Sequence, residues 1–133
     1  NKEQFLEENM NTISESYPNY NIVKYINNLE DGSIVVSLYI GNDYYISPKI
    51  NFIDSRMLDK SFFSYPYSNE VEIIDALKSI GADFLYVNEK YHNPVLKKFE
   101  KDYKIITSDY FKLKYLSLLK SSNQQYVYKI RYD

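Results

Sequence analysis

The chain from residue 69 to residue 89 shows first a helical and then an extended pattern of hydrophobic positions. The apolar residues of the first part recur at the spacing of one helix face: Ile73, Ile74, Leu77 and Ile80. Asn69 is a suitable N-cap, Glu72 can complete a capping box with it, and Gly81 can end the helix. Residues 84–87 then form an apolar run, typical of a strand covered on both faces. The pattern predicts a helix over 70–80 followed by a buried strand.

The same reasoning predicts the other elements. The predicted helices cover residues 20–29 and a segment that begins at Asn93-Pro94, whose apolar face consists of Val95, Leu96 and Phe99. The further predicted strands are 34–39, 50–54 and 103–107. The apolar runs 113–119 and 126–132 predict a closing hairpin, although residues 109–120 could instead start as a helix.

This order of elements predicts an α/β fold. We expect a three-layer α/β/α sandwich with a Rossmann-like, mostly parallel sheet and a C-terminal antiparallel hairpin. The 133 residues are expected to form a single domain, with residues 1–16 as a lead-in helix or a linker from a preceding membrane region. The chain starts at Asn1 and not at Met, which suggests a piece of a longer or processed protein.

Composition narrows the function class. A hydrophobic content of 44% indicates a folded domain, and a net charge of -2 argues against a nucleic-acid partner. There is no cysteine, so disulfides, thiolate zinc sites and cysteine nucleophiles are excluded. The 16 Tyr residues could form a sugar- or partner-binding surface, although a coding bias that also favours Asn, Lys and Ile is the plainer explanation.

The candidate functional residues lie where the predicted parallel strands end, because ligands bind at the carboxyl ends of such strands. The candidate ligand-binding residues are Asp43, Tyr44, Tyr45, Asp54, Arg56, Glu89 and His92. Carboxylates beside an arginine could bind a metal or a sugar, but polar residues end strands in any fold of this kind. Glycine-rich phosphate loops and the GxSxG motif are absent from the sequence, and we expect no cofactor, no resident metal and no catalytic residue.

The C-terminal part of the chain is basic. Residues 97–133 contain nine Lys or Arg and four Asp or Glu. Lys97, Lys98 and Lys101 are candidates for a face toward a membrane or a partner, and Lys112 and Lys114 could extend it. An ordinary solvated helix face is the alternative.

Two stretches carry a resemblance to a known family: YNIVKYINNLEDGSIVVSLYIGNDYYISPKINFIDSR and, further on, EIIDALKSIGADFLYVNE. In the order of their predicted elements and in the kind of residues that form them, they resemble the extracytoplasmic C-terminal domain of bacterial multi-pass GT-C glycosyltransferases. These are the mannosyl- and arabinosyltransferase-like membrane enzymes. The Tyr-rich run 126–130 resembles the closing strand of that domain. The resemblance covers roughly residues 17–132 and consists of a pattern, without an invariant motif.

The resemblance implies a non-catalytic accessory domain on the extracytoplasmic face of a bacterial cytoplasmic membrane. Its partners would be the transmembrane region of its own parent protein and a carbohydrate or polyprenyl-phosphate sugar. The catalytic acid of that family lies among membrane helices, so no catalytic residue is carried onto this chain. The alternatives are a stand-alone α/β ligand-binding or regulatory domain, and a small hydrolase that uses Asp54, Glu89 or His92.

Overall fold

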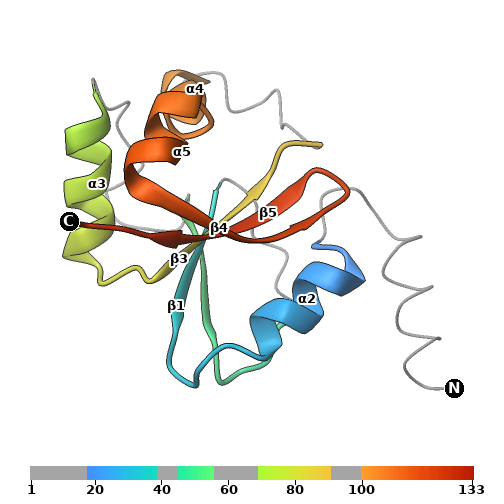
Figure 1. The fold of residues 1–133 in the computed structure, drawn as a ribbon. Helices are drawn as coiled ribbons and strands as arrows, with labels where there is room; N and C mark the ends of the chain where they lie inside the picture. Colours follow the sequence, from blue (N-terminus) through green and yellow to red (C-terminus); the bar gives the residue numbers. More distant parts are fainter. Residues whose placement is uncertain (1–17, 39–44, 56–68, 91–99) are drawn as a thin grey trace, which may run out of the picture.

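A computed structural model of the chain describes residues 18–38, 45–55, 69–90 and 100–133 (Figure 1). These residues form an α/β fold with a five-stranded mixed sheet and four helices. The helices are α2 (Tyr20–Asn27), α3 (Glu70–Ser79), α4 (Glu100–Ile106) and α5 (Asp109–Tyr115). The strands are β1 (Ile34–Ser37), β2 (Asn51–Asp54), β3 (Phe84–Asn88), β4 (Leu116–Ser122) and β5 (Gln125–Ile130).

The order of strands across the sheet is β2-β1-β3-β5-β4. Strand β1 pairs in parallel with β2 and with β3, so strands from the predicted segments 34–39 and 84–87 lie side by side in the sheet. Strand β5 lies antiparallel between β3 and β4, and the last two strands form the predicted hairpin. The two residues of its turn, Asn123 and Gln124, both have positive φ, as a tight hairpin turn requires.

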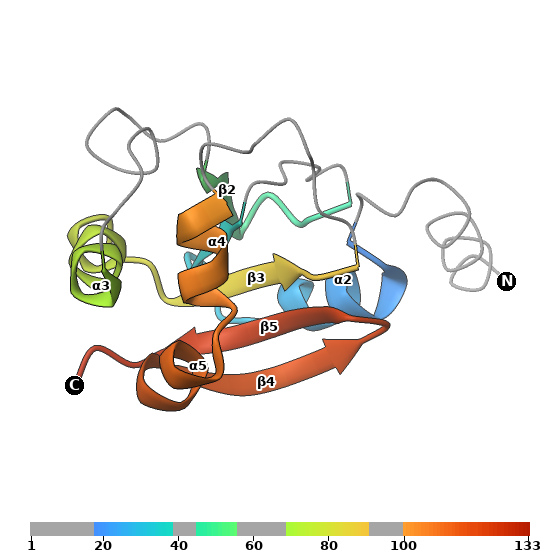
Figure 2. The ribbon, with the colours of Figure 1, turned by 90° about the horizontal axis from the view of Figure 1, so that it is seen from above.

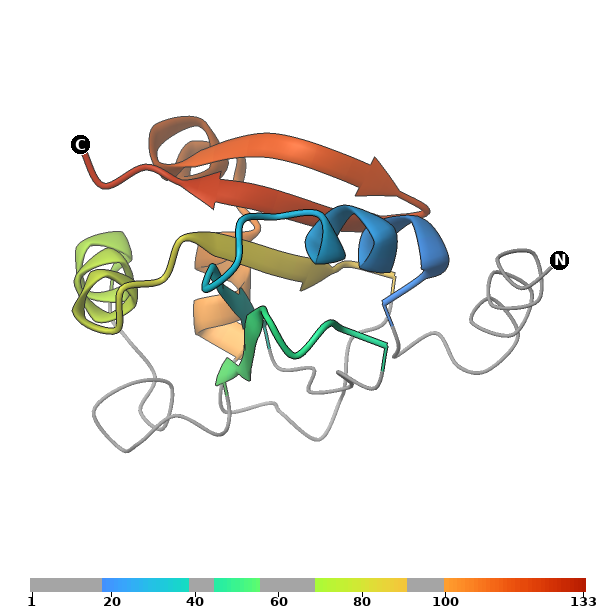
Figure 3. The ribbon, with the colours of Figure 1, turned by 90° about the horizontal axis from the view of Figure 1, so that it is seen from below.

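Helices contact both faces of the sheet. Ile22 and Ile26 of α2 pack with Val35, Tyr86 and Val127. The opposite face packs against the other three helices through a cluster that includes Val36, Leu85, Tyr128, Ile73, Leu77, Ile106 and Phe111. Neighbouring strand residues such as Val35 and Val36 belong to different clusters because side chains alternate along a strand. Figures 1 and 3 show α2 on one side of the sheet, and Figure 1 shows α4 and α5 on the other.

Side-chain caps define the helix starts. The Oδ1 of Asn69 accepts a hydrogen bond from the backbone N–H of Glu72 at 3.0 Å, so the predicted N-cap of α3 is confirmed. Gly81, with φ +70°, follows the helix. Asn19 caps α2 in the same way, through its Oδ1 and the backbone N–H of Ile22 at 3.1 Å. The signals at Asn69 and Gly81 explain why α3 could be predicted, and the Asn19 cap is a local signal of the same kind for α2.

The predicted strand over 103–107 is wrong, because residues 100–106 form α4. Asp102 and Ile106 are both fully buried, and their separation of four residues places them on one helix face. The adjacent pair Ile105 and Ile106 resembled a short strand because a two-residue apolar run carries no helical period. The choice left open for residues 109–120 is now decided: α5 is a helix, and β4 starts at Leu116. The helix predicted from Asn93-Pro94, with Val95, Leu96 and Phe99, lies outside the described residues, as do residues 1–16.

We predict that Leu77→Ala lowers the free energy of unfolding by about 2–5 kcal/mol, because the leucine is fully buried in the cluster between α3 and the sheet. Urea unfolding followed by circular dichroism measures this change. Val71→Ala on the same helix is the matched control, since Val71 is 53% exposed and should change stability by less than about 0.5 kcal/mol. Equal effects of the two variants would contradict the assigned face of α3.

Candidate functional site

The carboxyl ends of the three parallel strands share one edge of the sheet with the β4–β5 turn. Antiparallel pairing sets Asn88, at the end of β3, opposite Gln125, at the start of β5. The backbone N–H of Glu89 donates to the carbonyl of Gln124 at 2.9 Å, so the chain after β3 is tied to the hairpin. Strand-end and turn residues that are far apart in the sequence therefore lie together, which makes this edge the candidate region for a site.

On the face that α2 covers, the polar side chains at this edge form a structural network. The Tyr86 hydroxyl donates to Oε1 of Gln125 at 2.9 Å, and the same oxygen accepts the backbone N–H of Asn19 at 2.9 Å. The side-chain amide of Asn19 donates to the carbonyl of Ser122 at 3.0 Å. Burial raises the pKa of Tyr86, and a weaker opposing effect comes from its hydrogen bond with Asn88. The network joins the start of α2 to the hairpin, and its polar atoms serve the fold.

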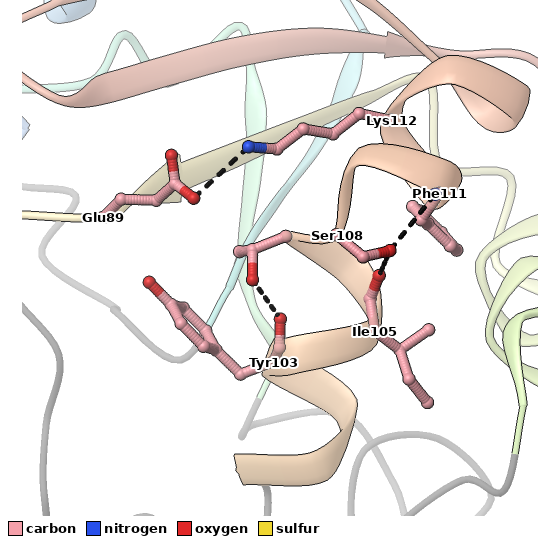
Figure 4. Close-up of polar contacts among 7 residues, drawn as sticks. Glu89, Tyr103, Ile105, Ser108, Phe111 and Lys112 are labelled. Carbon is pink, nitrogen blue, oxygen red and sulfur yellow. Dashed lines mark hydrogen bonds and ion pairs between the residues drawn. The ribbon is translucent and has the colours of Figure 1, made fainter.

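On the opposite face, an ion pair lies among tyrosines. Nζ of Lys112, from α5, is 3.3 Å from Oε1 of Glu89, and the two side chains are 29% and 26% exposed (Figure 4). The same Nζ lies 5.8 Å from the centre of the Tyr126 ring. The rings of Tyr126 and Tyr128 stack with 5.9 Å between their centres. With Tyr103 of α4, these residues form what we call the Glu89–Lys112 cluster: Glu89, Tyr103, Lys112, Tyr126 and Tyr128.

The corner between α4 and α5 positions two members of this cluster. The Thr107 hydroxyl donates to the carbonyl of Tyr103 at 2.7 Å. The Ser108 hydroxyl donates to the carbonyl of Ile105 at 2.6 Å and accepts the backbone N–H of Phe111 at 3.2 Å. Ser108 thus closes α4 and caps α5 at once. Figure 4 shows that Tyr103 and Lys112, on the two sides of this corner, both extend toward Glu89.

Burial and the charge of Glu89 both raise the pKa of two tyrosines of the cluster. Burial raises the pKa of Tyr103, and the charge of Glu89 raises it further. Burial likewise raises the pKa of Tyr128, again with a contribution from Glu89. The phenols of Tyr103 and Tyr128 therefore remain hydrogen-bond donors, beside a carboxylate that accepts and an ammonium that donates. The cluster offers both kinds of hydrogen-bonding partner together with flat aromatic faces.

The opposite edge of the sheet has a hollow of about 530 Å³, lined in part by Glu30, Asp31, Asp83 and Tyr132. Two of its polar side chains, Asp83 and Tyr132, hydrogen-bond to the backbone of the fold. The backbone N–H of Ile34 donates to Oδ2 of Asp83 at 2.9 Å, and the Tyr132 hydroxyl donates to the carbonyl of Ala82 at 2.5 Å. Burial, with help from the charge of Asp83, raises the pKa of Tyr132 to about 12. We therefore place the candidate site at the carboxyl edge.

The structure separates three predicted site residues. Strand β1 lies between β2 and β3, so Asp54 and Glu89 are two strands apart, or roughly 10 Å. They also point to opposite faces, because Asp54 shares the alternation of Phe52, which packs toward α2, whereas Glu89 pairs with α5. Tyr45 lies elsewhere: its carbonyl accepts the side-chain amide of Asn27, in the last turn of α2, at 3.1 Å. These three residues do not converge on one site.

Other predicted residues lie outside the described part of the chain. They are Asp43, Tyr44, Arg56, His92, Lys97 and Lys98, together with the side chain of Lys101. The expectations for them stay predictions.

Sequence reasoning missed Lys112, Tyr103, Tyr126 and Tyr128 as site residues. Lys112 was assigned to a basic surface, but it forms a half-buried ion pair with a residue 23 positions earlier. Ser108 followed by Asp109 was a usable signal, because a serine N-cap and an acidic first turn predict a helix start. That signal would have decided the open choice for residues 109–120 in favour of a helix start, and so placed Lys112 on a helix.

Comparisons with models of protein families, with curated proteins and with solved structures find no match to this chain. Within residues 18–38, 45–55, 69–90 and 100–133, no helix has the length and apolar character needed to span a bilayer. The same described segments contain no group of three or more His, Cys, Asp or Glu side chains arranged to hold a metal ion.

We predict that alkaline pH destabilises the protein. Tyrosines of the unfolded chain ionise near pH 10, whereas the folded state raises the pKa of Tyr86, Tyr103, Tyr128 and Tyr132, mainly through burial. The resulting stability is fully present below about pH 10 and is lost as pH rises through the folded-state values. Denaturant titrations across this range, with phenolate absorbance as a second signal, measure it. Titration of all 16 tyrosines near pH 10 at unchanged stability would contradict the burial of these phenols.

We also predict that Glu89→Gln lowers the pKa of Tyr103 and of Tyr128, because a neighbouring negative charge is removed while burial remains. Titration of ring-labelled tyrosines by NMR gives both values. Asp54→Asn removes a carboxylate from the opposite face and is the matched control. Unchanged values in Glu89→Gln, or equal shifts in the control, would show that the Glu89 charge does not act on these rings.

Proposed function

We propose that the chain is a non-catalytic α/β domain that binds a sugar or a similar polyhydroxylated ligand at the Glu89–Lys112 cluster. The observation that carries this proposal is a half-buried carboxylate–ammonium pair bordered by three tyrosines at the carboxyl edge of the sheet. Tyr103 and Tyr126 are only partly buried, so a ligand at this edge can reach them.

The chemistry of the cluster suits a sugar. Each sugar hydroxyl both donates and accepts hydrogen bonds, and the cluster supplies an acceptor in Glu89, a donor in Lys112 and phenols that do both. The C–H faces of a sugar ring are apolar and pack on flat aromatic rings, which Tyr126 can supply. A few convergent polar groups beside apolar surface are the usual composition of a small-molecule site.

Binding is favoured over hydrolysis by the placement of the carboxylates. Hydrolysis of a glycosidic bond commonly needs two carboxyl groups that flank the same bond. Asp54 and Glu89 lie two strands apart and face opposite sides of the sheet, so they cannot flank one bond. His92, the third residue of the hydrolase alternative, lies outside the described residues.

We further propose that the fold is a three-layer α/β/α sandwich of Rossmann-like kind, and that the domain belongs to a membrane glycosyltransferase-like parent protein. Helices on both faces of a sheet with three parallel strands support the fold proposal. The resemblance of residues 17–132 to GT-C accessory domains supports the parent, an extracytoplasmic position, and the transmembrane region and a polyprenyl-phosphate sugar as partners.

The test is a binding titration of the 133-residue chain with a panel of neutral monosaccharides, oligosaccharides and a water-soluble prenyl-phosphate sugar, followed by NMR. We expect weak, saturable binding that shifts the ring signals of the cluster tyrosines. Glu89→Gln and Lys112→Met should each lower the affinity by about tenfold or more, because each removes a charged hydrogen-bonding partner. Asp54→Asn, at the same edge but on the other face, is the matched control and should bind as the parent does.

Three outcomes would overturn the proposal. The first is the absence of binding across the panel. The second is binding that survives in Glu89→Gln and fails in Asp54→Asn. The third is turnover of any glycoside in the panel by the unmodified chain, which would make the domain an enzyme.

A further inference from the structure

The exposed apolar side chains of the described residues gather in one short segment. Five large apolar side chains of the described residues are exposed, and all but Val71 lie between residues 110 and 119. The four are Tyr110, Leu113, Leu118 and Leu119, with exposed fractions of 57%, 82%, 56% and 38%. Leu113 is thus almost as exposed as a leucine can be. We call the surface of these four side chains the α5–β4 surface.

The orientation of α5 about its axis explains which of its side chains belong to this surface. Phe111 and Tyr115, four residues apart, turn inward, and their ring centres lie 5.1 Å apart. Tyr110, Leu113 and Lys114 therefore fall on the outward side of the same helix. Leu118 and Leu119 follow in β4, the edge strand of the sheet. Figure 2 shows α5 beside the start of β4 at the outer margin of the molecule.

The charge of the segment is positive, although the chain as a whole is acidic. Residues 110–120 contain three lysines and no acid, whereas the whole chain has a net charge of -2. The charge of one of the three, Lys112, is offset by its ion pair with Glu89. Lys114 is exposed, and its Nζ lies 3.1 Å from the Tyr110 hydroxyl, a hydrogen bond that raises the pKa of Lys114. Arg131 adds a guanidinium that donates to the carbonyls of Leu113 and Leu116. The nearest acids in sequence are Asp109 and Asp133, one at the start of α5 and one at the chain end.

The outer edge of strand β4 is poorly suited to pairing with a strand from a second copy of the chain. The register of β4 against β5 shifts between Leu118 and Lys120, so Leu119 forms a bulge. Bulges and lysines on an edge strand hinder the addition of another strand. Continuous sheet extension across β4 is therefore disfavoured.

We propose that the α5–β4 surface docks on an anionic lipid surface. Exposed leucines can enter the boundary between headgroups and acyl chains, and a tyrosine is suited to that depth. Lys114 lies beside the apolar side chains on the outward side of α5 and can reach lipid phosphates, to which its positive charge is complementary. This proposal concerns a different surface from the Glu89–Lys112 cluster and stands independently of the sugar site.

The test is sedimentation of the whole chain with vesicles of phosphatidylcholine, with and without phosphatidylglycerol. We expect binding only to the anionic vesicles, and loss of binding at about 1 M salt, where the screening length falls to about 3 Å. Leu113→Ser should weaken binding about tenfold, because the leucine no longer enters the bilayer. Lys114→Glu should weaken it by at least about fivefold.

Each variant has a matched control on another surface. Val71→Ser removes an exposed apolar side chain from α3, and Lys49→Glu makes the same change of net charge on an exposed loop. Both should bind vesicles within about twofold of the parent, and all four variants should melt as the parent does, since the side chains are exposed.

Other outcomes would overturn the proposal. The proposal would be contradicted by equal binding to neutral and anionic vesicles. It would also be contradicted if the variants and their controls lost the same amount of vesicle binding. Self-association that disappears in Leu113→Ser would identify a second copy as the occupant. Binding to polyglutamate as tight as binding to anionic vesicles, and insensitive to Leu113→Ser, would indicate an acidic protein partner.

Discussion

The pairing of β5 between β3 and β4 is the constraint on which the rest of the structure depends. The strand is antiparallel to both neighbours, so its backbone is hydrogen-bonded along both edges. Its side chains alternate between the two hydrophobic clusters: Val127 packs toward α2, whereas Tyr128 and Ile130 pack toward the other helices. A shift of one residue in the register of β5 would turn each of its side chains to the other face, so both clusters would lose the β5 side chains that pack in them.

The same register assembles the candidate site. It sets Asn88 opposite Gln125 and places Tyr126 and Tyr128 on the face where Glu89 meets α5. The Thr107–Ser108 corner then brings Lys112 to that carboxylate. An ion pair at this depth contributes little to stability by itself, since it remains partly in contact with solvent. Its consequence is chemical: two opposite charges lie beside the hydroxyls of the cluster tyrosines, at the edge where α/β proteins bind ligands.

The features that could be predicted from the sequence are those that depend on residues close together in the chain. The cap at Asn69, the stop at Gly81 and the run 84–87 are local signals, and α3 and β3 formed where they indicated. The strand predicted over 103–107 failed because Ile105 and Ile106 favour either state, and burial of Asp102 beside Ile106 depends on tertiary packing. The pair of Glu89 and Lys112 joins two elements that only the hairpin register brings together, so no local pattern could reveal it.

Native-state hydrogen exchange tests the central role of β5 most directly. If β5 holds both cores and the site together, backbone amides of Val127, Tyr128 and Leu85 exchange only through global unfolding. Their exchange free energy should then equal the unfolding free energy from denaturant titration, while amides of the edge strand β2 exchange with a lower free energy. Exchange of the β5 amides through local opening, at a free energy below that of β2, would contradict this account.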